Sequence, residues 1–270
     1  MLAAVVAFSG AALASGQPVP WQMELQPAAS EKMIEVHKFH NLLLLIITAI
    51  VAFVLALLVW VMIRYNARSN PTPSKVAHNT MIEIAWTIIP VIILVVIAIP
   101  SFRLLMLSDN LPPADITIKA IGKQWYWSYE YPDNGNFTFD ALMVEEKDLQ
   151  PGQPRLLAAT ENIVVPVGKV VRIVTTASDV IHSFALPSFG VKIDAVPGRL
   201  NETWFRAEQE GIFYGQCSEL CGARHAFMPI AVEVVSQERF DAWIAEAQAK
   251  FARSGAPETF ASADGAGQAN

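Results

Sequence analysis

Two cysteines, two histidines and one methionine are the side chains in this chain whose types and spacing best suit metal binding. Cys217, Cys221, His225 and Met228 lie within twelve residues, and His182 lies 35 residues before Cys217. Thiolate and thioether sulfurs are soft ligands, which favour copper over magnesium, calcium or manganese. Two thiolates can bridge two copper ions and leave one imidazole for each ion. The spacing therefore favours a dinuclear electron-transfer site.

The same residues allow three other structures. Two cysteines in an exported domain form a disulfide by default, because thiols oxidise outside the cytoplasm. A closed tetrahedral zinc site would use the cysteines and histidines but would gain nothing from a thioether. A blue-copper site needs two histidines, one cysteine and a weak axial methionine, and this sequence has that layout with one cysteine more. On residue types alone these alternatives stay open.

Composition divides the chain into an apolar part and an acidic part. The whole chain is 53% hydrophobic and 16% charged, with a formal net charge of −6, whereas about 25% charged residues is usual. Residues 1–111 contain six basic and five acidic side chains, and residues 112–270 contain thirteen and twenty. This composition excludes a disordered chain and a disulfide-stapled miniprotein. The acidic part disfavours nucleic acid and favours a basic partner.

The apolar part predicts a membrane anchor. Residues 39–63 are uncharged over 25 positions, and a helix of that length is about 37 Å long, enough to cross a bilayer. A second uncharged run covers the 19 residues 84–102. We expect an outer segment at 17–38 and a transmembrane hairpin at 39–107, with spans at about 39–63 and 84–105.

Charge and the N-terminal sequence predict the orientation of this hairpin. Residues 1–16 resemble a signal peptide, ending in small residues but lacking a positively charged start. Residues 64–82 between the spans contain Arg64, Arg68 and Lys75 and no acidic residue, so we expect this loop on the cytoplasmic side. The C-terminal domain then lies in the periplasm, anchored in a bacterial inner membrane.

Residues 112–253 have the pattern of an all-β domain. Turn sequences rich in Gly, Pro and Asn separate short β-rich runs, which is typical of a β-sandwich or Greek-key barrel. The expected strands are 115–121, 124–131, 137–143, 163–167, 170–177, 180–186, 202–206, 211–216 and 229–235.

The end of the chain is expected to differ from this β domain. A closing helix is predicted from Ser236, a plausible N-cap, to Arg253, because apolar residues recur there at helical spacing. Residues 254–270 are rich in Ala, Gly and Ser and predict a disordered tail.

Four motifs resemble those of cytochrome c oxidase subunit II: GQCSELCGARHAFMP, DVIHSF, VKIDAVPGR and IGKQWYWSYEYPD. The likeness covers nearly all of residues 30–245. It implies a two-helix transmembrane hairpin followed by an all-β cupredoxin-like Greek-key sandwich with a C-terminal helix, which holds a dinuclear copper A centre. Carried over by position, the copper ligands are His182, Cys217, Cys221, His225, Met228 and the backbone carbonyl of Glu219.

The resemblance also implies roles for residues outside the ligand set. Trp125 occupies the position of the exposed aromatic through which cytochrome c delivers its electron, although an aromatic in a strand can simply pack the sandwich. Glu219 would also bind a magnesium ion shared with subunit I. Glu83 corresponds to the mouth of a proton pathway into subunit I, with a helix-end charge as the alternative. The candidate acids for docking a lysine-rich cytochrome c, which are otherwise ordinary surface charges, are Glu130, Asp133, Glu161 and Asp179.

The expected function is therefore electron entry into a bacterial haem–copper oxidase of the aa3 type. This subunit would pass single electrons from cytochrome c to haem in subunit I, where O2 is reduced with proton pumping, and subunit III is a further expected partner. The alternative is a membrane-tethered copper chaperone or thiol reductant, which also has a Cys-x-x-x-Cys pair and a distant histidine but uses a thioredoxin-like α/β fold. A nitrous-oxide-reductase-type copper A domain shares the ligand loop but lacks a two-span anchor.

Overall fold

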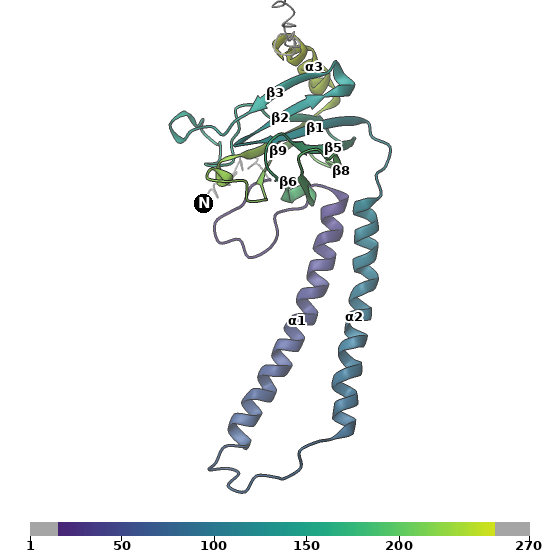
Figure 1. Ribbon diagram of the computed structural model, residues 1–270, viewed down its shortest axis with the longest axis vertical. Coiled ribbons are helices and arrows are strands. Elements are labelled where there is room, and N and C mark those ends of the chain that lie inside the picture. Colours follow the sequence, from purple (N-terminus) through teal and green to yellow (C-terminus); the bar gives the residue numbers. More distant parts are fainter. Residues whose placement is uncertain (1–15, 252–270) are drawn as a thin grey trace, which may run out of the picture.

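A computed structural model describes residues 16–251 as a helical hairpin joined to a β domain (Figure 1). The expected signal peptide, except for Gly16, and the expected tail at 254–270 lie outside the described residues. Gly16 forms an isolated parallel bridge with Phe213, so the chain contacts the β domain before it enters the hairpin.

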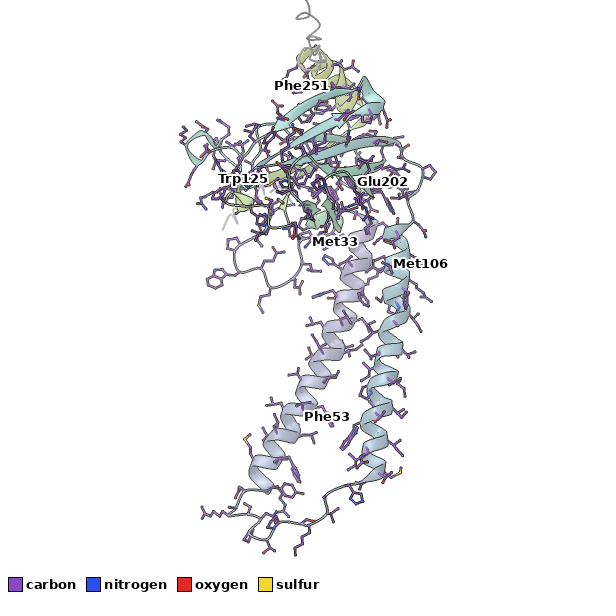
Figure 2. The ribbon with its side chains drawn as sticks, in the orientation of Figure 1. Met33, Phe53, Met106, Trp125, Glu202 and Phe251 are labelled. Atoms are coloured by element: carbon purple, nitrogen blue, oxygen red, sulfur yellow. The ribbon has the colours of Figure 1, made fainter. Side chains whose placement is uncertain are left out.

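The hairpin consists of α1 (Glu31–Arg64) and α2 (Thr80–Asp109). Ser30 and Asn79 cap their N-termini with side-chain oxygens that accept backbone N–H groups. Because these capped polar turns continue the helices beyond the apolar stretches, both are longer than the predicted spans. Both are long and apolar enough to cross a membrane, and their side chains project freely along most of their length (Figure 2).

The β domain is a sandwich of two five-stranded sheets. In spatial order the first sheet contains β3 (Phe137–Ala141), β2 (Tyr126–Tyr131), β1 (Ile116–Lys123), β5 (Val170–Ala177) and β8 (Asn201–Arg206). The second contains β4 (Ile163–Pro166), β10 (Pro229–Val235), β9 (Gly211–Cys217), β6 (His182–Leu186) and β7 (Val191–Ala195). Pairs are antiparallel except β1 with β5 and β4 with β10, which are parallel.

The core lies between these sheets, and aromatic side chains of β2 form much of it. Trp127, Tyr129 and Tyr131 are fully buried, in agreement with alternation along a strand that has one face inward. The helix α3 (Gln237–Phe251) closes one end of the sandwich, where the Trp243 ring lies 5.3 Å from that of Tyr131. The predicted closing helix is therefore confirmed.

Nine of the ten strands coincide with predicted runs, and β7 was not predicted. It has only five residues, of which Lys192 and Asp194 face solvent. Such a short run carries little signal by itself. Pairing with β6, in which His182 lies opposite Ala195, makes it a strand.

The first turn of α1 is attached to the β domain. Ala29 N–H donates to Ser188 O at 2.8 Å and Ala29 O accepts from Glu208 N at 3.0 Å. The Lys32 ammonium donates to Trp204 O at 2.9 Å and lies 5.0 Å from the centre of that indole ring. Figure 2 shows Met33 at this junction, so the position of the hairpin is linked to the strands through backbone contacts and a buried cation.

Candidate metal centre

A loop between two adjacent strands brings most of the sulfur and nitrogen donors together. Cys217 is the last residue of β9 and Met228 directly precedes β10. Cys217 N–H donates to Met228 O at 3.1 Å, which closes the loop at its base. Cys221 and His225 lie between them, and β6 contributes His182 from the other side of β9.

The three sulfur atoms of this loop are neighbours. Cys221 Sγ lies 3.9 Å from Cys217 Sγ and 3.5 Å from Met228 Sδ. Both cysteines are free and buried, and the Met228 side chain is 1% exposed. The disulfide that is the default for two exported cysteines is therefore not what this structure contains.

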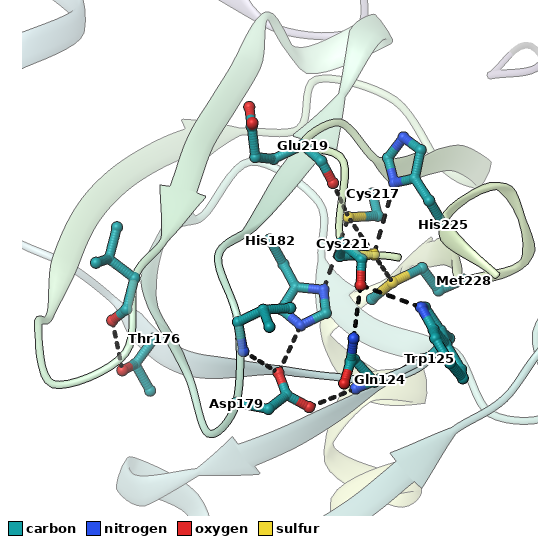
Figure 3. A network of polar contacts seen from close by, with 12 residues as sticks. Gln124, Trp125, Thr176, Asp179, His182, Cys217, Glu219, Cys221, His225 and Met228 are labelled. Atoms are coloured by element: carbon teal, nitrogen blue, oxygen red, sulfur yellow. Dashed lines mark hydrogen bonds and ion pairs between the residues drawn. The ribbon is translucent and has the colours of Figure 1, made fainter. Parts of the chain in front are cut away.

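Each histidine presents a ring nitrogen to one of the thiols. His182 Nδ1 lies 3.8 Å from Cys217 Sγ, and His225 Nδ1 lies 3.6 Å from Cys221 Sγ. The ligand atoms of His182, Cys217 and Cys221 all lie within 4.8 Å of one another. In Figure 3 the two imidazoles approach the sulfur atoms from different sides.

Glu219 contributes its backbone rather than its side chain. Its carbonyl oxygen lies 3.3 Å from Cys217 Sγ, while its carboxylate is exposed and points away from the sulfur atoms (Figure 3). A charged carboxylate would be costly in this buried cluster without a partner. The carbonyl can therefore face a metal ion while the carboxylate remains available outside the cluster.

Asp179 fixes the orientation of the His182 imidazole. Asp179 Oδ1 lies 2.8 Å from His182 Nε2, and the imidazole is fully buried. A carboxylate that accepts a hydrogen bond from one ring N–H leaves the other nitrogen with its lone pair free, which is how metal-binding histidines are commonly oriented. Here the free nitrogen is Nδ1, which faces Cys217.

The two thiols ionise with unequal ease. Burial opposes ionisation of Cys217, but contacts with His182 and neighbouring backbone groups outweigh it and lower the pKa of this thiol to about 7. Burial and the adjacent Cys217 thiolate raise the pKa of Cys221 to about 12. Two thiolates this close repel one another. Cations between them would remove that repulsion, so the pair fits a metal site.

The donor set decides which metal fits best. Zinc would be satisfied by two thiolates and two imidazoles, which leaves the buried thioether and the Glu219 carbonyl without a role. Soft sulfur ligands together with imidazoles favour copper. Six donor groups from one loop and one strand edge are more than one tetrahedral ion requires, so they fit a pair of copper ions.

Trp125 and its neighbour Gln124 lie beneath the metal-binding loop. The indole Nε1–H donates to Cys221 O at 3.3 Å, and Gln124 Nε2 donates to the same oxygen at 2.8 Å. The Trp125 side chain is half-buried, because it packs against the core beside this loop. One side of the indole borders a hollow of about 300 Å³ that Leu142 and Phe227 also line.

The four acids proposed for docking are spread over the domain, and each has a partner. Glu130 pairs with Lys119 at 3.2 Å and Glu161 with Lys250 at 2.6 Å. The Asp133 carboxylate accepts the Thr117 backbone N–H at 2.7 Å. Of the four, Asp179 alone contacts a metal-binding side chain. Docking by these acids stays a prediction.

Glu83 lies in the first turn of α2, at the end of the hairpin away from the β domain (Figure 1). It borders a shallow groove together with Thr80 and Thr87. The structure therefore separates it from the metal-binding cluster by the length of the helix, and its role stays a prediction.

Three residues without a predicted role lie around the metal-binding cluster, and one of them, Gly122, lies directly against a metal-binding side chain. Gln124 contacts both Asp179 and Cys221. A Cβ atom on Gly122 would lie 2.7 Å from His182 Cδ2, and one on Gly222 would lie 3.1 Å from Gln124 Nε2. Gly122 and Gln124 belong to the motif that contains Trp125, and Gly222 follows a ligand cysteine, but the sequence carries no further signal of these contacts.

Comparison with known proteins agrees with this geometry. Family models for cytochrome c oxidase subunit II match the chain twice, the transmembrane domain over residues 18–104 and the periplasmic domain over residues 116–235. A probable cytochrome c oxidase subunit 2 from Rickettsia bellii is 58% identical over 244 residues, which cover 90% of each chain. Cytochrome c oxidase subunit 2 from Cereibacter sphaeroides is 45% identical over 251 residues, covering 86% of this chain and 82% of that one.

A solved structure is similar to the β domain. The crystal structure of the periplasmic domain of subunit II of cytochrome oxidase from Bradyrhizobium japonicum is 63% identical, with a TM-score of 0.50, and the match covers 53% of this chain and 99% of that one. The family models thus cover both membrane helices and the two-sheet domain that contains the His/Cys/Met cluster. The chain belongs to the cytochrome c oxidase subunit II family.

Proposed function

We propose that this chain is the electron-entry subunit of a respiratory terminal oxidase and holds a dinuclear copper A centre in its periplasmic domain. The observation that carries the proposal is the convergence of two unbonded thiols, two imidazole nitrogens and a buried thioether within one cluster. The proposed ligands are the side chains of His182, Cys217, Cys221, His225 and Met228 and the carbonyl oxygen of Glu219.

When bound, a pair of copper ions would supply a carrier for one electron at a time, and the Cys217 and Cys221 thiols would be among the groups that hold it. The chain's contribution is to hold the donors still. Cys217 and Met228 are joined by a backbone hydrogen bond, and His182 is buried and oriented by Asp179. Ligands anchored at strand ends move little, which limits the rearrangement that accompanies a change of charge.

Trp125 is the proposed entry point for the electron. Its indole donates to the carbonyl of Cys221, a proposed ligand, at 3.3 Å, so a short path of bonds connects the domain surface to the cluster. The outer part of the chain has seven more acidic than basic residues. Such a charge favours encounter with a basic donor such as cytochrome c.

The remaining partners are proposed from the family. The hairpin would pack beside subunit I, which receives the electron at haem and reduces O2, with subunit III in the same complex. The exposed Glu219 carboxylate is free to bind a magnesium ion at the contact with subunit I. Glu83 would stand at the mouth of a proton pathway at the other end of α2.

A copper chaperone or thiol reductant is the rival function. Two features of the structure count against it: the cysteines sit in a two-sheet β domain, and a buried methionine sulfur lies 3.5 Å from Cys221 Sγ. A transfer site releases its metal readily, whereas this thioether is enclosed in the core.

Copper reconstitution of the full chain in detergent tests the proposal. We expect two copper ions per chain by elemental analysis, with an electron paramagnetic resonance spectrum of one electron shared by both ions. Binding of a single zinc ion, or a product that stays colourless when the copper-loaded chain is reoxidised, would contradict it. Rapid loss of copper to an acceptor protein would support the chaperone function instead.

A further inference from the structure

We propose that Gln124 is a positioning residue that fixes the histidine side of the copper site relative to its thiolate side. It lies in the short connection between β1 and β2, outside both the cysteine loop and the strand that carries His182. The inference rests on the proposed copper centre and concerns what holds its two halves in register.

The backbone of Gln124 holds the histidine side. Its N–H donates to Asp179 Oδ2 at 2.7 Å, and the other oxygen of that carboxylate contacts His182 Nε2 at 2.8 Å. The carboxylate is therefore held at both oxygens. Rotation of the imidazole would break a contact that Gln124 helps to keep in place.

The side chain of Gln124 holds the thiolate side. Nε2 donates to Cys221 O at 2.8 Å. This carbonyl lies in the middle of the loop that runs from Cys217 to Met228. Trp125 donates to the same oxygen at 3.3 Å. Gly222, which has a φ of +121°, leaves room for both donors, since a Cβ there would lie 3.1 Å from Gln124 Nε2 and 3.2 Å from Trp125 Cζ2.

The backbone and side-chain hydrogen bonds of Gln124 join elements that are far apart in the sequence. Gln124 lies 55 residues from Asp179 and 97 residues from Cys221, and Figure 3 shows it between them. A neutral amide suits this place because it donates to a carbonyl, which a carboxylate would repel and an aliphatic side chain would leave with only the longer hydrogen bond from Trp125. Gln124 is itself exposed.

The test uses the full chain reconstituted with copper. Gln124→Leu removes the side-chain hydrogen bond to Cys221 O and keeps the backbone hydrogen bond to Asp179. Gln124→Glu keeps the size of the side chain and directs a carboxylate at Cys221 O. The matched control is Gln248→Leu. Gln248 is a residue of α3, and its Nε2 also donates to a backbone carbonyl outside its own element, Asn134 O at 2.6 Å. The measurements are copper affinity by chelator competition and the paramagnetic resonance spectrum.

We expect both Gln124 variants to bind copper about 10- to 100-fold more weakly than wild type, as is typical when a residue that orients a metal ligand is lost. Their spectra should also shift, whereas Gln248→Leu should match wild type in both measurements. Circular dichroism of the copper-free chains separates these effects from unfolding. If Gln124→Leu does not fold, the copper affinity and the spectrum of Gln124→Glu test the positioning role instead.

Two results have different meanings. If wild type itself fails to bind two copper ions, the proposed function fails. If wild type binds them and the Gln124 variants behave like Gln248→Leu, the positioning role is wrong and the proposed function stands.

Discussion

The orientation of His182 depends on a neighbour that has no side chain. Gly122, near the end of β1, lies so close to the imidazole that a Cβ atom would be 2.7 Å from Cδ2, 2.8 Å from Cγ and 2.9 Å from Cβ of His182. These distances are shorter than van der Waals contact, so an added methyl group must displace either the ring or the strand. The edge of Trp127, whose ring centre is 6.0 Å from that of His182, limits the space on another side.

We therefore expect Gly122→Ala to weaken copper binding by about tenfold or more, because the displaced imidazole no longer faces Cys217 at its present angle. Chelator competition measures the loss, and the spectrum should change with it. Gly168→Ala is the control: a Cβ there has nothing within 4 Å, but the φ of +76° strains alanine by roughly 1–3 kcal/mol. Equal copper affinity in the two variants would show that the close approach to His182 is unimportant.

Met228 is proposed to be a copper ligand as well as a buried side chain of the core. Met228→Leu should change stability by less than about 1.5 kcal/mol, because the two side chains have similar volumes. It removes the thioether next to Cys221, so we expect weaker copper binding and a shifted spectrum with the fold intact. Met33→Leu is the matched control, since Met33 is also buried but lies in α1, where this helix joins the β domain. A Met228→Leu chain with the wild-type spectrum would remove Met228 from the ligand set.

At the scale of elements, the contact between α1 and β8 decides how the hairpin is joined to the sandwich. Lys32 is 2% exposed, and its ammonium is held by the Trp204 carbonyl and the face of the same indole. Ser30, the N-cap of α1, also donates to Phe189 O at 2.8 Å. A helix end that is capped and hydrogen-bonded to a second element moves with that element.

Lys32→Met should loosen this junction, since it keeps the length of the side chain but leaves the buried Trp204 carbonyl unpaired at a cost of about 1–3 kcal/mol. We expect backbone amides of residues 16–30 to exchange hydrogen roughly tenfold faster in detergent, because local opening becomes easier. Lys38→Met is the control, since Lys38 is exposed and pairs with Glu35 in the same helix. Unchanged exchange in Lys32→Met would mean that the backbone contacts of Ala29 suffice.

At the scale of the whole molecule, charge is separated along the long axis. The loop between the helices is basic, and residues 112–270 carry seven more acidic than basic side chains. Lysines already pair with Glu130 and Glu161, so the long-range field of the domain, rather than those individual acids, is the better basis for predicting how a partner approaches.

We expect the rate of electron uptake from a basic cytochrome c to fall as ionic strength rises, because salt screens the attraction beyond about 10 Å at 0.1 M. Stopped-flow reduction of the assembled oxidase at several salt concentrations measures this. An acidic electron-donor protein is the control and should show the opposite dependence. A rate for the basic donor that does not change with salt would contradict electrostatic steering.

Sequence reasoning was most successful where the signal is local. The uncharged runs predicted both helices, alternation and turn residues predicted nine of ten strands, and the sulfur and imidazole residues predicted the cluster that the structure brings together. It missed β7, whose identity as a strand comes from pairing with β6. It gave Asp179 only as a candidate docking acid, whereas the structure shows that this exposed carboxylate also contacts His182.

What the sequence determined by itself, therefore, is which residues can bind copper and which stretches are helix or strand, because residue type and local periodicity carry that information. The tertiary structure alone decided that the thiols stay unbonded, that Gln124 lies between Asp179 and Cys221, and that Lys32 is buried under Trp204. Each of these contacts joins residues 55 or more positions apart, apart from the two neighbouring cysteines. Such contacts form only when the two sheets pack face to face and α1 packs against β8, and no local pattern along the chain records how they do so.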